Sequence, residues 1–171
     1  MESGSIVEFI DHQKIMCAVI LEVKNSRLRL LTENNREVKL SVSRLLHKDK
    51  VRLDLSLGRD QMVHALKGVV SKRKELLNQV DIKDLWEVLN AEQVWIDLAT
   101  MTAFCFPGSP CGDHESAVLR AFFDDRLYFK FSGIYPIYLI RRRSGIHEVH
   151  QPVSAGFDNP FSAGLFPALG N

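Results

Sequence analysis

Short apolar runs separated by polar turns dominate the first part of the chain, from Ser5 to about His47. The runs are SIVEFI, MCAVILEV, RLRLLT and REVKLSV, and the turn-prone stretches between them are DHQK, KNS and ENN. Within RLRLL, leucines alternate with arginines, which is typical of a strand with one apolar and one polar face. The pattern predicts four or five short strands. Because so small a sheet must curl to cover its dry face, we expect a small antiparallel β-barrel.

The next part of the chain has the period of an amphipathic helix, from about Gly58 to Asn78. Its mainly apolar stripe recurs at spacings of three and four residues. The residues of this stripe are Met62, Leu66, Val69, Val70, Arg73 and Leu77. We therefore expect one long helix that packs through a single face.

Three shorter helices and a hairpin are predicted after the long helix. Asp81 is placed to cap a helix that begins near Ile82, and a further helix is expected from Ile96 to Phe106, before Pro-Gly. Asp113 is the expected cap of the helix HESAVLRAFF. Two runs rich in Tyr, Phe and Ile then flank a Ser-Gly turn at 132–133, which predicts a two-stranded hairpin.

Helices followed by a hairpin are the layout of a winged helix-turn-helix, in which the hairpin also closes the helical core. The predicted fold class is α+β. We expect a small β-barrel at residues 1–56, a winged helix-turn-helix domain with a leading long helix at residues 57–143, and an irregular tail or linker at residues 144–171.

Composition adds few constraints, since 171 residues with 46% hydrophobic and 25% charged residues are ordinary for a soluble protein. No apolar run approaches the roughly 20 residues that span a bilayer, and the N-terminus lacks the pattern of a signal peptide. Cys17, Cys105 and Cys111 form no CxxC pair, so we expect reduced thiols. These features predict a cytoplasmic protein with no membrane partner. They do not indicate an oligomeric state.

The net charge of only +1 conceals a local excess of cations. Between Arg120 and Arg143 the sequence holds six basic residues and two acidic ones. Such a patch suits phosphate binding, because neutralising phosphates releases condensed counterions. Tyrosines nearby could stack on bases, and the run SKRKE adds a second basic segment. The predicted nucleic-acid-binding residues are Arg120, Arg126, Lys130, Arg141, Arg142, Arg143, Tyr128, Tyr135, Lys72 and Lys74.

A structural interpretation stands beside each of these assignments. Arginines after a strand also protect a sheet edge from aggregation, and aromatic residues in a short hairpin commonly belong to its core. A basic run on a helix is commonly its solvated face.

The sequence contains none of the catalytic motifs that were considered. The string IHEVHQ differs from the zinc motif HExxH, because His147 and His150 are three residues apart instead of four. The sequence contains no GxxxxGK[ST], GxGxxG or GxSxG. We therefore assign no catalytic residue and no metal ligand.

The order of parts resembles a known family. The segments that carry the likeness are GSIVEFID, VSRLLH and DDRLYFKF, with the last at the junction of the expected recognition helix and wing. Together, residues 1 to about 143 resemble the N-terminal region of some bacterial exoribonucleases of the ribonuclease II (RNB-type) family. In those relatives a comparable winged-helix module precedes the nuclease body.

The resemblance implies a parent protein that is a processive 3′-to-5′ exoribonuclease, a hydrolase whose catalytic domain holds Mg²⁺ with a cluster of aspartates. This chain contains no GxDxxDxDD-like run, so no catalytic residue carries over and no cofactor is expected here. The chain is then a fragment or a shortened relative that guides RNA without cutting it. Its implied partners are single-stranded RNA and the nuclease domain of the parent chain.

Two other functions remain open. The near-neutral charge and the tail residues Phe157, Phe161 and Phe166 fit a protein-interaction module that docks on another subunit. A DNA-binding regulator is also possible, with the expected recognition helix presenting His114, Glu115 and Arg120. That face is poor in the side chains that read base edges.

Overall fold

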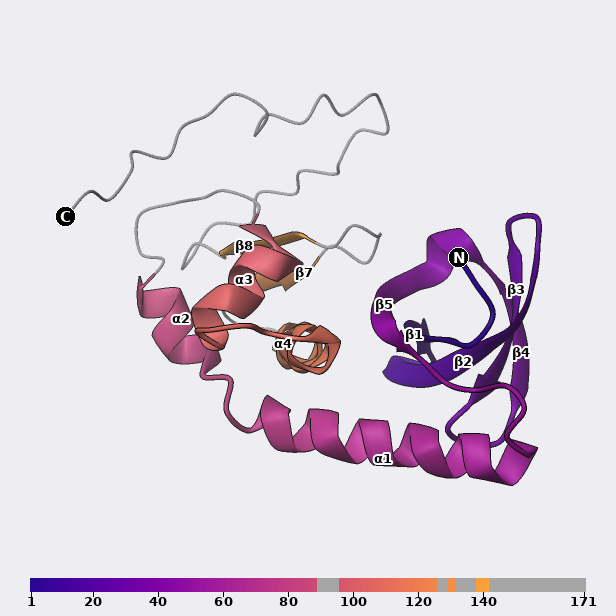
Figure 1. Ribbon diagram of the computed structural model, residues 1–171. Helices are drawn as coiled ribbons and strands as arrows, with labels where there is room; N and C mark the ends of the chain where they lie inside the picture. Colours follow the sequence, from indigo (N-terminus) through magenta and orange to yellow (C-terminus); the bar gives the residue numbers. More distant parts are fainter. Residues whose placement is uncertain (89–95, 126–128, 132–137, 142–171) are drawn as a thin grey trace.

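The computed structural model describes residues 1–88, 96–125, 129–131 and 138–141, with only the backbone of the last two segments. It is a mixed α+β fold with a five-stranded antiparallel sheet and, in the described ranges, four α-helices (Figure 1). No helix in these ranges combines the length and the apolar character needed to cross a bilayer.

The predicted strands at the start of the chain are confirmed. They form a sheet in the order β4-β3-β2-β1-β5. A short 3₁₀ turn at Val42–Arg44 joins the last two strands along the chain. The sheet curls but is not closed, since β4 and β5 do not pair within the described residues, and the expected barrel is therefore not observed. The strands are β1 (Ser5–Asp11), β2 (Lys14–Lys24), β3 (Arg27–Thr32), β4 (Glu37–Ser41) and β5 (Leu45–Arg52).

Helix α1 (Arg59–Leu77) covers part of the second face of the sheet. The concave face is filled by its own side chains, among them Val7, Phe9 and Leu30. On the outer face, Val19 and Leu31 pack against this long helix. Both faces of the central strands are thus dry, which a sheet of this size cannot achieve by curling alone.

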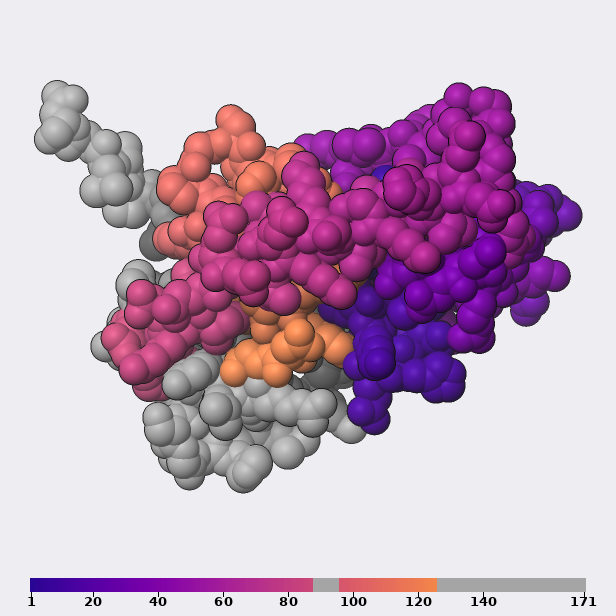
Figure 2. Space-filling view, turned by 90° about the horizontal axis from the view of Figure 1, so that it is seen from below, coloured from indigo at the N-terminus to yellow at the C-terminus, as the bar shows by residue number. Residues whose placement is uncertain are grey.

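Helix α1 lies along the molecule and contacts both of its parts. Its N-terminal half packs on the sheet through Met62, Val63 and Leu66, and it also packs against α4 (Gly112–Asp124) (Figures 1 and 2). The predicted stripe is the packed face of this helix: Met62, Leu66 and Arg73 are buried, and Val69, Val70 and Leu77 are partly buried.

The second part of the chain builds a separate core around α4. This core contains Met101, Val118, Leu119 and Phe122, and Ile15 and Leu46 of the sheet join it. A three-stranded antiparallel sheet in the order β6-β8-β7 lies beside the helices. The remaining elements are α2 (Ile82–Val88), β6 (Ile96–Asp97), α3 (Leu98–Cys105), β7 (Phe129–Phe131) and β8 (Tyr138–Arg141).

Two predicted helix starts need correction. Residues Ile96 and Asp97 form the short strand β6, and the Asp97 carboxylate then caps α3 by accepting from Thr100 N at 2.9 Å. The N-cap of α4 is Cys111 instead of Asp113, which lies in the first turn. The cap at Asp81 is confirmed, since its Oδ1 accepts from Asp84 N at 3.0 Å.

The three cysteines are free thiols, as predicted. Cys17 is buried in the sheet and Cys105 is partly buried, whereas Cys111 is exposed.

Candidate functional site

Charged side chains meet where the sheet, α1 and α4 come together. Glu8 stands in the middle of β1, and Arg73 stands on the packed stripe of α1. Both side chains are fully buried. Two charges at such depth are tolerated only if they are paired and hydrogen-bonded, so their partners define the site.

The guanidinium of Arg73 binds three carboxylates from three elements. Its Nη1 lies 3.0 Å from Glu8 Oε1 on β1, and its Nη2 donates to Asp49 Oδ2 on β5 at 2.7 Å. Its Nε donates to Asp113 Oδ1 on α4 at 3.0 Å. Planar guanidinium groups suit such fixed, multidentate pairing better than the point charge of lysine does.

A second arginine reaches the same carboxylate from α4. Arg120 Nη2 donates to Glu8 Oε1 at 2.5 Å, and its Nε lies 3.2 Å from the same atom. A helix can approach β5 this closely because residue 112 is glycine. A Cβ atom added at Gly112 would lie only 2.5 Å from Asp49 Oδ1.

His47 on β5 completes the group. Its Nε2 lies 3.0 Å from Glu115 Oε2, and its Nδ1 lies 3.6 Å from Glu8 Oε2, an ion-pair distance too long for a good hydrogen bond. Neither Nδ1 nor Oε2 has a closer partner among the described residues. We call the whole set the buried charge cluster: Glu8, His47, Asp49, Arg73, Asp113, Glu115 and Arg120.

The cluster changes the protonation of its members in opposite directions. Burial acts to raise the pKa of Glu8, but His47, Arg73 and Arg120 together outweigh it and hold that pKa well below its ordinary value. Burial acts to lower the pKa of His47, but its contacts with Glu115 and Glu8 raise it to about 9. His47 is therefore cationic at neutral pH.

Folding stability should consequently fall as the pH rises through the range in which His47 loses its proton. A histidine whose folded pKa is raised stabilises the fold fully below its unfolded value of 6.5, and this contribution is lost by about pH 9. The contribution is of the order of 3 kcal/mol. Urea unfolding between pH 6 and pH 10 should show this decline in the natural chain and a flatter profile in His47→Gln. Equal slopes in the two proteins would contradict the assignment.

The buried charge cluster joins the sheet to α1 and α4. Where Glu8, Asp49 and Asp113 converge, the Arg73 guanidinium occupies the place that a metal cation would need. The described part of the chain contains no group of three or more His, Cys, Asp or Glu residues that could hold a metal ion. Burial also raises the pKa of the Cys17 thiol, which keeps it protonated and unreactive.

Two of the residues predicted to contact phosphate pair with carboxylates of the buried charge cluster instead. Arg120 is directed at Glu8 and is mostly buried, and the exposed Lys72 pairs with Asp113, with 2.7 Å between Nζ and Oδ2. Lys74, one residue beyond Arg73, has an exposed side chain.

The other predicted residues lie at the hairpin. The backbone register aligns Lys130 with Ile140 and Arg141 with Phe129, and their side chains lie outside the described part. Five further residues lie wholly outside the described ranges: Arg126, Tyr128, Tyr135, Arg142 and Arg143.

Helix α4, the expected recognition helix, is buried or partly buried up to Phe123, and its last residue, Asp124, is exposed. Within the described part, no residue from Gly112 to Phe123 is exposed. Its polar side chains turn inward, since Glu115 contacts His47 and Arg120 contacts Glu8. His114 stays at the N-terminus of the helix, where its Nδ1 accepts from Cys111 N at 3.1 Å.

The sequence places Arg73 on the apolar stripe but does not show that it binds three carboxylates. The signal for a buried charge is a charged residue in register with apolar neighbours. Glu8, in the run SIVEFI, gave the same signal on a strand. Asp49 and His47 lie where the apolar pattern ends, and nothing local in the sequence marks them.

Comparison of this chain with protein-family models, curated proteins and solved structures found no match.

Proposed function

We propose that this chain is the RNA-binding N-terminal region of an exoribonuclease of the ribonuclease II family, without nuclease activity of its own. The segments GSIVEFID, VSRLLH and DDRLYFKF support this origin. In this proposal the chain guides single-stranded RNA toward a nuclease domain elsewhere in the parent protein. That domain would supply the aspartates and the Mg²⁺.

The observation that carries the proposal is the arrangement of the second part of the chain. Its elements follow in the order α2, β6, α3, α4, β7, β8, and β8 lies between β6 and β7 in the sheet. This order and pairing support a winged helix in which the β7–β8 pair is the wing. The sequence at and after β8 carries the basic run Arg141 to Arg143. Because α4 is covered, RNA contact through the wing is favoured over base reading by a recognition helix.

The test is the salt dependence of binding. The chain should bind a labelled single-stranded uridine 20-mer in fluorescence anisotropy, and its affinity should fall with rising salt. Reversing Arg141, Arg142 and Arg143 to glutamate should weaken binding and reduce the slope of log affinity against log salt by about 0.7 for each contact removed. No affinity for single-stranded RNA at low salt, or tight sequence-selective binding to duplex DNA, would contradict the proposal.

The covered face of α4 counts against a DNA-binding regulator, whose recognition helix must expose side chains to the major groove. A protein-interaction role keeps one supporting feature in the described part, the exposed ring of Phe104 on α3. A single exposed aromatic residue is common on protein surfaces, so this role stays secondary.

A further inference from the structure

The outer face of the five-stranded sheet is divided into two areas. Under α1 it is apolar, with Leu31 of β3 packed against the helix. Arg27 and Arg29 share that face of β3 with Leu31, because side chains two residues apart point the same way. They are exposed. The face thus changes from apolar to cationic where α1 no longer covers it.

A bulge adds charged side chains to this uncovered area. The pairing of β2 with β3 shifts by one residue after Ile20. Beyond the shift, Glu22 lies opposite Arg29 and Lys24 lies opposite Arg27. Since residues directly opposite one another share a face, the shift places both side chains beside the arginines. Without this shift in register, Leu21 and Val23 would occupy this face in place of Glu22 and Lys24.

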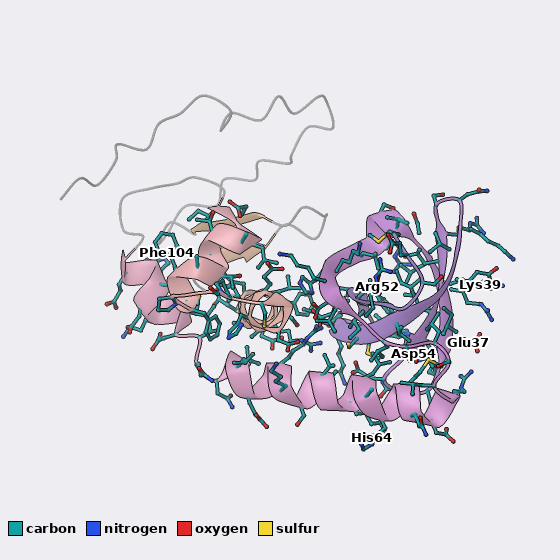
Figure 3. All side chains as sticks on the ribbon, viewed as in Figure 1. Glu37, Lys39, Arg52, Asp54, His64 and Phe104 are labelled. Atoms are coloured by element: carbon teal, nitrogen blue, oxygen red, sulfur yellow. The ribbon has the colours of Figure 1, made fainter. Side chains whose placement is uncertain are left out.

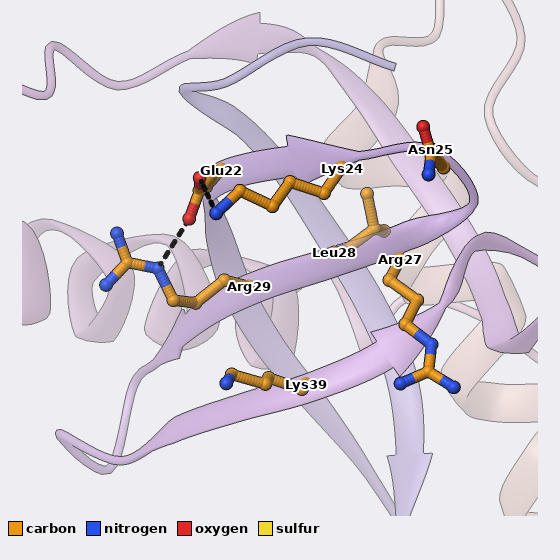
Figure 4. Close-up of a pocket in the computed structure, with 7 residues that line it drawn as sticks. All are labelled: Glu22, Lys24, Asn25, Arg27, Leu28, Arg29 and Lys39. Atoms are coloured by element: carbon orange, nitrogen blue, oxygen red, sulfur yellow. Dashed lines mark ion pairs between the residues drawn. The ribbon is translucent and has the colours of Figure 1, made fainter.

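These strands enclose a groove of about 570 Å³, drawn in Figure 4. The charged residues that line it are Glu22, Lys24, Arg27, Arg29 and Lys39, four cations and one carboxylate. Asn25 and Leu28 complete its lining, and no aromatic residue of the described part lines it. The groove therefore offers charge to a ligand without a surface on which bases would stack.

Only part of this positive charge is neutralised within the protein. Glu22 pairs with Lys24 at 2.9 Å and with Arg29 at 3.3 Å. Arg27 and Lys39 make no ion pair with any described residue, and Figure 4 shows both side chains beside the strands. Two cations therefore remain available in the groove, which has a net charge of +3.

The two neighbouring carboxylates, Glu33 and Glu37, leave Arg27 and Lys39 unpaired. Glu33 accepts from the backbone N of Cys17 at 2.7 Å. Glu37 lies 2.6 Å from Arg59 of α1 and 3.5 Å from Arg29. In Figure 3, Glu37 and Lys39 lie at the end of the molecule opposite α3, so the groove is remote from the proposed wing.

We infer that this groove is a second RNA site, one that binds the phosphate backbone of a single strand. The inference rests on the proposed function. The cations recur every second residue along a strand, about 6.6 Å apart. They also recur across neighbouring strands, about 5 Å apart, which suits a regular polyanion. The volume is in the range of sites that hold small molecules, so the groove is large enough for a few nucleotides of one strand. Without base contacts, its affinity is independent of sequence.

The test uses the whole chain and a labelled uridine 20-mer over a range of salt concentrations. The groove variant is Arg27→Gln with Lys39→Gln. The matched control is Lys48→Gln with Lys67→Gln, which removes the same charge from two exposed residues outside the groove that make no ion pair with any described residue. Neither double variant breaks a recorded ion pair, so the urea midpoints of both should equal that of the natural chain.

The groove variant should bind about tenfold more weakly at low salt and lose about 1.4 units of salt slope, from two phosphate contacts at about 0.7 each. The control should change affinity less than twofold. Glu22→Gln should instead tighten binding, because it removes the one carboxylate of the groove and releases Lys24, while Arg29 keeps its pair with Glu37. A gain of affinity is not produced by misfolding.

Three results would overturn the inference. Equal affinities of the groove variant and the control would exclude the groove and leave the proposed function intact. No RNA binding by the natural chain would remove the proposed function and the groove together. Competition by polyglutamate as effective as that by unlabelled RNA of equal charge would assign the groove to an acidic protein.

Discussion

Replacing Glu8 with glutamine is expected to lower the free energy of unfolding by about 3–5 kcal/mol, the usual cost of removing one partner from a buried ion pair. Glutamine keeps the size of the side chain but removes the charge shared by Arg73, Arg120 and protonated His47. These three cations would then be buried with too few carboxylates. Urea unfolding at pH 7 measures the loss.

The matched control for this change is Glu22→Gln. Glu22 also lies on a strand and also pairs with two basic side chains, but these pairs are exposed to solvent. Exposed pairs contribute about 0–1 kcal/mol, so the control should stay close to the natural chain. Equal midpoints for Glu8→Gln and Glu22→Gln would show that the depth of Glu8 has no energetic consequence.

Replacing Arg73 with leucine should have an effect of the same size, about 3–5 kcal/mol. Leucine would fill part of the space but would leave the carboxylates of Asp49 and Asp113 without the guanidinium that joins them. The neighbouring change Lys74→Leu removes one cation from the exposed side of the same helix, and about ±0.5 kcal/mol is expected there. Urea unfolding of the two variants compares adjacent positions directly.

The double variant Glu8→Gln with Arg73→Leu provides a further check. Residues in direct contact are coupled, so the double variant should be less destabilised than the sum of the two single ones by roughly 0.5–3 kcal/mol. Full additivity would show that Glu8 and Arg73 do not act as a pair. The result does not depend on any RNA-binding activity.

Much of the fold followed from local patterns. Alternation in RLRLL and the stripe of α1 predicted these elements and their buried faces, and Asp81 marked the start of α2. Local rules failed where a tertiary contact decided the outcome. Residues Ile96 and Asp97 look like the first turn of a helix, but they pair with β8, and this pairing delays α3 until Asp97 can cap it.

The site was less predictable than the fold, for a physical reason. Arg120 looks like a surface cation on an amphipathic helix, and its partner Glu8 is 112 residues away in the chain. No periodicity reports such a pairing. The sequence signals that were present, a carboxylate within SIVEFI and an arginine on an apolar stripe, indicate burial of charge without identifying the partner. Glu33 and Glu37 were equally unpredictable. Both lie near basic residues in the sequence, but Glu33 accepts from the backbone of Cys17 and Glu37 pairs with Arg59.

The buried charge cluster also affects how this region can evolve by recombination. Glu8 and Asp49 are encoded before the connection into α1, whereas Arg73 and Asp113 are encoded after it. A helical part transplanted onto a different sheet would carry its guanidinium along and leave two of its three anions behind. Exchange of one part without the other would therefore require compensating changes on both sides of the crossover.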